Sequence, residues 1–384
     1  MKVLLRALHD FAPRSKQVPD VTVSLDAAME WLARAQDTSG NGGVSRSYAL
    51  RFMRGHHQRR GWLGAYPETT GYIIPTFLDY SAQRGRPEYR ERARRMADWE
   101  SDVQMESGAV QGGTIDFPPS PAVFNTGQVL QGWARAHKEF ESPRYLESMR
   151  RAADFLVEAQ DPDGAWRRHG SRYARAGINT YDARTALGLL EAAARTGDPR
   201  HRDSAAKALR FTLTQQRPNG WFENCCLDDN RRPLLHTLAY TMEGLLEGGV
   251  LLEDPRLVDA ARRAADAVLE RLGPDGWLPG RLDDSWRPAA RWSCLTGDAQ
   301  TARVWSRLFE LTGEARYRDG AVRANRYVAG TQDLRDSDPG IRGGIQGSYP
   351  IWAEYGTYEY LNWAAKFFAD SLLSELNGES PSNR

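Results

Sequence analysis

One helical pattern recurs six times along this chain and constrains its fold more than any other feature. In each copy an amphipathic helix ends at Gln or Leu and continues into a Gly-rich turn, an extended stretch and a second helix. The six end positions, separated by 55 to 68 residues, are Gln36, Gln104, Gln160, Gln215, Leu272 and Gln332. A helical hairpin cannot bury its apolar stripe without neighbours. The repeats therefore predict an array of six stacked hairpins.

The two ends of the array favour a closed ring over an open solenoid. An open array needs polar terminal repeats, whereas the last copy is rich in aromatic residues from Trp352 to Phe368. The second helices are apolar on all sides, and the first helices have one charged face. We predict an all-α (α/α)6 toroid with twelve main helices and no sheet larger than short two-stranded pieces. Residues 20–376 would form this single domain, between an N-terminal extension (1–19) and a C-terminal tail (377–384).

The composition excludes several other classes of protein. Among 384 residues, 51 Lys and Arg balance 50 Asp and Glu, and this net charge of +1 argues against a nucleic-acid partner. No stretch approaches the roughly 18 to 20 apolar residues of a transmembrane helix. The N-terminal segment MKVLLRALHDFAPRS is too weakly apolar for a signal peptide. Three cysteines, an odd number, fit a reducing compartment. We therefore predict a cytoplasmic protein, and its oligomeric state stays open.

Two repeats carry a motif with a known counterpart. Gln160, Gly164 and Trp166 stand in the order of the QW motif of terpenoid cyclases, and Gln215 with Trp221 forms a shortened copy. The chain thus resembles α/α-toroid proteins, in which Gln and Trp tie an outer helix to the following turn. Two acidic motifs of the cyclases, Asp-x-Asp-Asp and Asp-Asp-x-x-Asp, are absent.

The same architecture is used by other families that act on sugars. They include six-hairpin glycosidases, polysaccharide lyases, sugar 2-epimerases and the helical domain of uronate C5-epimerases. The stretches 124–128 (FNTGQ) and 66–70 (YPETT) are similar to the starts of inner helices in that epimerase domain. The resemblance implies a ring whose inner helices begin around one central cavity.

Acidic residues at the starts of the second helices are the first candidates for catalysis. Asp182 and Asp298 occupy equivalent places two repeats apart. One interpretation makes them helix caps. The other makes them a pair of carboxyl groups in one cavity, spaced for hydrolysis with inversion.

A histidine and a tyrosine offer a second chemistry. His236 and Tyr240 are four residues apart on one helix, so they share a face. Such a pair can abstract a proton beside a carboxylate, the step shared by polysaccharide lyases and uronate epimerases. The alternative is a core histidine bonded to a backbone carbonyl.

Further polar and aromatic residues are candidates for substrate binding. Arg184 could grip a uronate carboxylate in a bidentate manner, or it could form an ion pair inside the ring with Asp182 or Glu68. Aromatic side chains could stack on sugar rings. The predicted substrate-binding set is Glu68, Tyr72, Asn125, Gln128, Arg184, Gln300, Trp292 and Tyr355.

Metal and cofactor motifs are weak in this sequence. Cys225, Cys226 and His236 suggest zinc, but their spacing is unspecific. The repeated Leu-Asp-Asp at 227–229 and 282–284 is first of all a turn. The Arg-rich segment 51–62 is either a lid that binds anions or an exposed insertion. No Gly-rich phosphate loop, Gly-x-Ser-x-Gly or His-Glu-x-x-His motif is present. We predict no cofactor and no metal.

Taken together, the residues favour an enzyme that acts on a glycan or a uronic-acid-containing sugar. Hydrolysis, β-elimination and epimerisation all stay open. One alternative is a terpenoid-cyclase-like or prenyl-binding protein, which requires an aromatic cavity nearly free of carboxylates. Another is a non-catalytic glycan-binding protein, because fold alone does not determine function.

Overall fold

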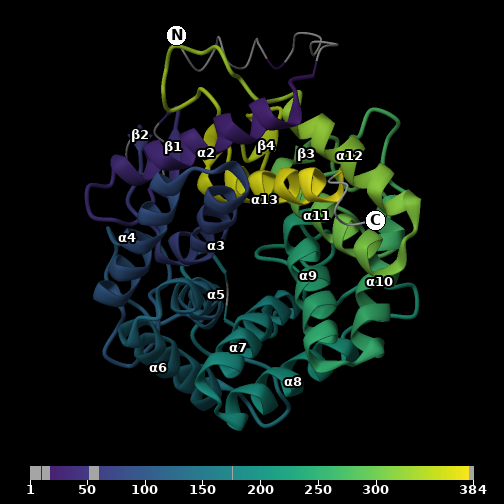
Figure 1. The fold of residues 1–384 in the computed structure, drawn as a ribbon. Helices are drawn as coiled ribbons and strands as arrows, with labels where there is room; N and C mark the ends of the chain where they lie inside the picture. The colour runs from purple at the N-terminus through teal and green to yellow at the C-terminus, as the bar shows by residue number, and fades with distance from the viewer. Residues whose placement is uncertain (1–9, 11–17, 52–59, 175, 380–384) are drawn as a thin grey trace.

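Two concentric layers of helices form the molecule (Figure 1). The computed structural model describes residue 10 and residues 18–51, 60–174 and 176–379. The outer helices are α2 (Val21–Asp37), α4 (Pro87–Val103), α6 (Pro143–Ala159), α8 (Pro199–Thr214), α10 (Pro255–Leu269) and α12 (Ala315–Ala329). The inner helices are α3 (Pro67–Arg84), α5 (Val123–Phe140), α7 (Ala183–Thr196), α9 (Leu235–Leu252), α11 (Leu295–Thr312) and α13 (Asn362–Glu379), and a 3-10 turn, η1 (Thr180–Asp182), precedes α7.

The inner helices close into a ring. Each packs against the next in chain order from α3 to α13, and α13 packs against α3. The last inner helix also pairs with the first outer helix, α2, so the sixth hairpin joins the two ends of the chain (Figure 1). The prediction of a closed (α/α)6 toroid with twelve main helices is therefore confirmed for the part of the chain that the structure describes.

Short turns fold each inner helix back onto an outer one. Gly85 and Gly197 end α3 and α7 in the left-handed conformation, with φ of 64° and 70°. Glycine adopts this conformation without strain. Pro87 and Pro199 then start the next outer helices, where a missing N–H costs nothing. These turns place the long loops, and any site built from them, at the opposite face of the ring.

A repeated glutamine links neighbouring outer helices. The side-chain amide of Gln160 donates to the carbonyl oxygens of Gly164, in the following turn, and Ser204, in the next outer helix, at 3.1 and 2.9 Å. Equivalent pairs of hydrogen bonds are made by Gln36, Gln104, Gln216 and Gln332. In the fourth repeat α8 ends with Gln215 as its cap, as predicted, but the linking glutamine is the next residue, Gln216. The acceptor for Gln332 lies in α2, so this link also closes the outer layer.

The longest sheet has three strands, one more than predicted. Its strand order is β2 (Gly61–Trp62), β1 (Ser47–Ala49) and β5 (Glu359–Leu361), all antiparallel. A second pair joins β3 (Ser293–Cys294) to β4 (Ser348–Tyr349). Strands of two or three residues have too few positions to show alternation, so the sequence pattern could not reveal them. The sheet brings the loop before α3 next to the loop before α13.

Three further predictions can be compared with the described residues. All three cysteines are buried and unpaired. Across the described ranges, no helix combines the length and apolar character that a membrane crossing requires. Most of the Arg-rich segment, residues 52–59, lies outside the described part of the chain.

Candidate functional site

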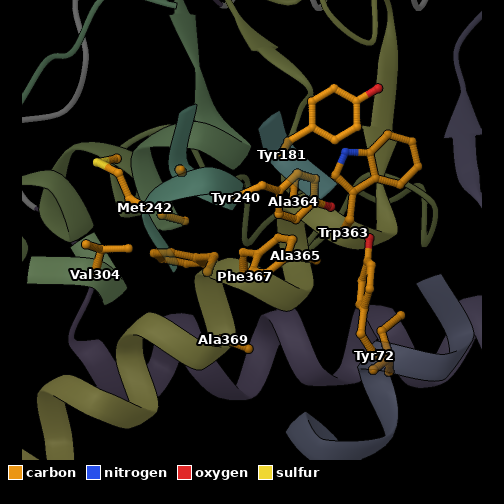
Figure 2. Close-up of a cluster of buried hydrophobic side chains, with 14 of the residues drawn as sticks. Tyr72, Tyr181, Tyr240, Met242, Val304, Trp363, Ala364, Ala365, Phe367 and Ala369 are labelled. Atoms are coloured by element: carbon orange, nitrogen blue, oxygen red, sulfur yellow. The ribbon is translucent and has the colours of Figure 1, made fainter. Parts of the chain in front are cut away.

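The loops that precede the inner helices surround a cavity at one end of the ring. It encloses about 610 Å3 of space between protein atoms, including the open solvent at its mouth. It is lined by Arg46, Tyr66, Glu68, Tyr72, Phe124, Ser171, Tyr173, Ala174, Tyr181, Leu227, His236, Tyr240, Tyr355 and Trp363. Most of these side chains are aromatic, and Figure 2 shows four of them, Tyr72, Tyr181, Tyr240 and Trp363, in the buried cluster at its base.

Glu68 is the carboxyl group of this cavity. It lies in the first turn of α3 and is 9% exposed. The Tyr66 hydroxyl donates to Glu68 Oε2, and Asn125 Nδ2 donates to the Tyr66 oxygen at 3.2 Å. Burial raises the pKa of Glu68 to about 7, against the opposing effects of Tyr66, Arg184 and Arg46. A group with this pKa can both give and accept a proton near neutral pH.

Arg46 supplies a positive charge to the same cavity. Its guanidinium lies against the rings of Tyr173 and Trp363, 5.1 and 5.0 Å from their centroids. Nη1 donates to Glu359 Oε2 at 2.5 Å, while Nε is buried without a hydrogen-bond partner among the described residues. Burial opposes the charge, but Glu359 and neighbouring tyrosines hold the pKa of Arg46 above its ordinary value. The cavity therefore contains a permanent cation with an unused donor.

His236 and Tyr240 both line the cavity, as their spacing predicts. Their ring centroids are 4.3 Å apart, and His236 Nδ1 lies 2.5 Å from Gln300 Oε1. An amide oxygen only accepts, so Nδ1 carries the proton and Nε2 is the acceptor. Burial lowers the pKa of His236 to about 4, and it raises the pKa of Tyr240 far above its ordinary range. His236 is therefore a weak base and Tyr240 a weak acid. Such a pair suits hydrogen bonding better than proton abstraction.

The two candidate aspartates do not meet in this cavity. Asp182 lines a smaller adjoining pocket, where burial raises its pKa to about 8. Its side chain accepts from Thr185 Oγ1 at 3.3 Å and makes no capping bond to its helix. Asp298 is fully buried and lines neither of the two pockets. The expectation that both carboxyl groups face one cavity is therefore not met, and the argument for inversion that rested on their spacing no longer applies.

Arg184 lies beneath the cavity rather than in it. It is 1% exposed, its Nε donates to Glu243 Oε2 at 2.8 Å, and its Nη1 donates to Gln128. Its guanidinium lies over the rings of Tyr72, Tyr240 and Phe367, at 5.1 to 5.3 Å from their centroids. The structure therefore shows the ion-pair interpretation of Arg184, with Glu243 as the partner in place of Asp182 or Glu68.

The remaining predicted residues divide into three groups. Glu68, Tyr72 and Tyr355 line the cavity. Asn125, Gln128 and Gln300 are buried behind it and hold Tyr66, Arg184 and His236 respectively. Trp292 packs against Gly280 of its own loop and is not among the lining residues.

A zinc site at the cysteines finds no support in the described residues. Cys225 Sγ is 3.2 Å from Thr241 Oγ1, and Cys226 Sγ donates to Asp228 at 3.0 Å. The group with metal-binding geometry that the described residues contain is Asp154, Asp198 and His201, on the outer helices. Arg200 already pairs with both of those carboxylates. Charge balance there needs no ion.

Arg46, Tyr66, Tyr173 and Trp363 are cavity residues that sequence reasoning did not assign to the site. Tyr66 precedes Glu68 by two residues, so its position was the one available signal. Arg46 lies in a loop more than 300 residues from Trp363. Only the pairing of β1 with β5 brings them together.

The comparisons with known proteins agree on the fold. No family model matches the chain. Among solved structures, an unsaturated glucuronyl hydrolase specific for heparin superposes with a TM-score of 0.73 at 15% identity, over 94% of this chain and 97% of the other. Two others are unsaturated glucuronyl hydrolases from Bacillus sp. GL1 (TM-score 0.73, 16% identity, 94% and 97% covered) and Streptococcus agalactiae (TM-score 0.64, 12% identity, 96% and 94% covered). The chain has the α/α-toroid fold of the six-hairpin glycosidase type.

Proposed function

We propose that this chain is a carbohydrate-active enzyme, specifically a hydrolase of sugars that carry a uronic acid. One observation carries the proposal: a carboxyl group whose pKa is raised to about 7 by burial and a permanently charged arginine line the same aromatic cavity. The arginine suits the substrate's carboxylate, the carboxyl group suits proton transfer, and the aromatic rings suit the faces of a sugar.

The roles divide between the two charged side chains. Arg46 would bind the uronate through its guanidinium, which Glu359 and the rings on either side hold in place at the cavity wall. Glu68, protonated below about pH 7, would donate its proton to the glycosidic oxygen as the glycosidic bond breaks and water attacks the sugar. The attacking water would lose one proton to solvent, and the Glu68 carboxylate would take one proton back from solvent. His236 would accept a hydrogen bond from a sugar hydroxyl at Nε2.

The structural neighbours narrow the first substrates to test. One of them is described as responsible for the degradation of glycosaminoglycan, and another was solved with dGlcA-GalNAc6S. Elimination and epimerisation with His236 as the base are less favoured, because burial lowers the pKa of this histidine to about 4. Unsaturated glucuronyl disaccharides are therefore the leading candidates.

The test is a screen of the purified chain against uronic-acid oligosaccharides. Unsaturated glucuronyl disaccharides should lose the ultraviolet absorbance of their conjugated double bond and release a free sugar. Glu68→Gln should slow the release about 100-fold, while Asp102→Asn, an exposed change on the outer wall, should leave it unchanged. Turnover of neutral disaccharides alone would contradict the assignment of a uronate substrate.

A prenyl-binding or terpenoid-cyclase-like protein remains the second candidate, favoured by the many aromatic rings of the cavity. A cavity that holds Glu68 and Arg46 is a poor match for an uncharged isoprenoid chain. A third candidate is a glycan-binding protein without turnover. Thermal shift distinguishes them, because a ligand that binds the folded state raises its stability. We also propose a cytoplasmic location, in keeping with three unpaired cysteines.

A further inference from the structure

Three loops meet on one side of the cavity mouth around a single arginine. They are residues 215–234 before α9, 270–294 before α11 and 330–361 before α13. Arg281 belongs to the middle loop, where it pairs with Leu234 in an antiparallel bridge. Its side chain is only 3% exposed although it is charged. A buried cation at a junction of loops needs a structural reason.

The contacts of Arg281 reach both neighbouring loops. Nη1 and Nη2 donate to the two carboxylate oxygens of Asp228 at 3.0 and 2.7 Å, a bidentate pair. Nε donates to Glu354 Oε2 at 3.1 Å, and Nη1 also donates to the Arg232 carbonyl at 3.0 Å. Bidentate charged hydrogen bonds are among the strongest and most directional in proteins.

Each carboxylate partner is the chain neighbour of a residue in the cavity wall. Leu227 precedes Asp228, and Tyr355 follows Glu354. Leu227 and Tyr355 both line the cavity, whereas Arg281 and its two partners do not. The Asp228 and Glu354 side chains are 59% and 48% exposed. Asp228 also accepts from Cys226 Sγ and the Asp229 N–H, and Glu354 also lies 3.7 Å from Arg232, but among the described residues only Arg281 contacts both carboxylates.

The electrostatics agree with a strong pair. Partial burial alone would raise the pKa of Asp228, yet the hydrogen bonds and charge of Arg281, with hydrogen bonds from Cys226 and the Asp229 N–H, lower it to about 2. The carboxylate therefore stays ionised at every pH at which the fold is expected to persist. The aspartate at the same place in the next repeat, Asp283, accepts from the backbone N–H groups of Ser285 and Arg287 and closes a turn. Asp228 instead binds the guanidinium of Arg281.

We propose that Arg281 is a positioning residue that links the loop before α9 (residues 215–234) to the loop before α13 (residues 330–361). This link would hold Leu227 and Tyr355 in the cavity wall. The part that concerns turnover rests on the proposed function. The part that concerns the loops does not, and it can be measured without any substrate.

The first experiment is hydrogen exchange of the full chain. In Arg281→Met, the amides of residues 226–232 and 351–356 should exchange about tenfold faster or more, while those of α9 and α13 keep their wild-type rates. Arg217→Met is the matched control, because Arg217 pairs with Asp284 and Glu223 from a 43% exposed position. This control should leave both segments unchanged.

A second variant guards against misfolding of the first. The double variant Asp228→Asn with Glu354→Gln removes the ion pairs of Arg281 with these two carboxylates. Both substitutions lie at exposed positions, and the arginine stays in place. The double variant should accelerate exchange in the same two segments. If either variant is folded and both segments exchange at wild-type rates, the inference is overturned.

Kinetics provide the last readout. If the proposed function holds, Arg281→Met should raise KM for an unsaturated glucuronyl disaccharide about tenfold and lower kcat by less, because the wall binds the sugar and the reacting groups stay in place. Arg281→Lys should recover only part of the loss, since lysine cannot make the bidentate pair. A wild-type protein that turns over no uronic sugar would sink the proposed function, while the exchange result would still decide the role of Arg281.

Discussion

Two arginines with nearly the same surroundings have opposite relations to the cavity. Arg46 and Arg184 each pair with a buried glutamate and lie against aromatic rings. The Arg46 side chain is 14% exposed and lines the cavity, whereas the Arg184 side chain is 1% exposed and does not. Arg46 comes from a loop next to β1, and Arg184 comes from the first turn of an inner helix.

The difference shows what each element can do with a buried charge. An inner helix is surrounded by other helices, so the hydrogen-bond acceptors of Arg184 all lie inside the ring. The charge of Arg184 in turn keeps the Glu243 carboxyl group ionised. Burial opposes that ionisation, but Arg184, Arg303 and Lys366 together lower the pKa of Glu243 to about 2. A loop residue has one open side. The Arg46 side chain therefore lines the cavity, and the Arg184 side chain does not.

The largest effect should follow from replacing Arg184, which lies beneath the cavity. Arg184→Met leaves Glu243 buried without its main partner, which should lower the free energy of unfolding by about 3 to 5 kcal/mol. Denaturant unfolding measures this loss, and Arg184→Met combined with Glu243→Gln should recover part of it. The control Arg200→Met, at a 61% exposed side chain, should cost about 1 kcal/mol or less. Equal losses of unfolding free energy in the two single variants would contradict the distinction between the buried Arg184 and the exposed Arg200.

The next effect concerns the acid that faces Arg46. Glu68→Gln should lower kcat about 100-fold, the usual contribution of a positioned proton donor. In the wild type, kcat should fall as the pH rises through about 7, because the protonated form of Glu68 is lost there. A pH profile of both proteins checks this, since the glutamine variant should lack that limb. An unchanged alkaline limb in the variant would assign the titration to another group.

The arginine of the cavity should affect binding rather than folding. Arg46→Lys keeps a charge for Glu359 but loses the planar donor set, so KM for a uronic sugar should rise about tenfold. Stability should change by less than it does in Arg184→Met. Comparison of uronic and neutral sugars under the same conditions separates recognition of charge from general binding. A variant that loses stability and keeps its KM would make Arg46 a second structural arginine.

Salt should produce the smallest difference between the two sites. A ligand carboxylate that approaches Arg46 from solvent is screened, so KM should rise a few-fold, by roughly 2 to 5 times, between low salt and about 0.5 M. The buried pair of Arg184 is screened far less, so the salt dependence of unfolding should be the same in wild type and in Arg184→Met with Glu243→Gln. KM measured over a salt series, with unfolding curves in the same buffers, tests both halves. A KM independent of salt would contradict charge recognition at Arg46.

Much of this architecture could be predicted because it repeats. Six copies of one helical pattern predict six hairpins, and the glutamines at the helix ends make the same two hydrogen bonds in five of them. Part of the site also follows from position, because Glu68 and His236 lie in the first turns of inner helices and Tyr240 lies one turn after His236. Those turns must surround the mouth of a closed ring.

The sequence by itself determined which helices face inward and which residues begin them, because both depend on local periodicity and turn chemistry. Only the tertiary structure decided which arginine lines the cavity and which carboxyl groups lie in it. Arg46 reaches Trp363 through a strand pairing that spans most of the chain, and Asp182 and Asp298 occupy equivalent repeat positions yet differ in surroundings. Burial and charge depend on what lies across the ring, and no spacing along the chain encodes that.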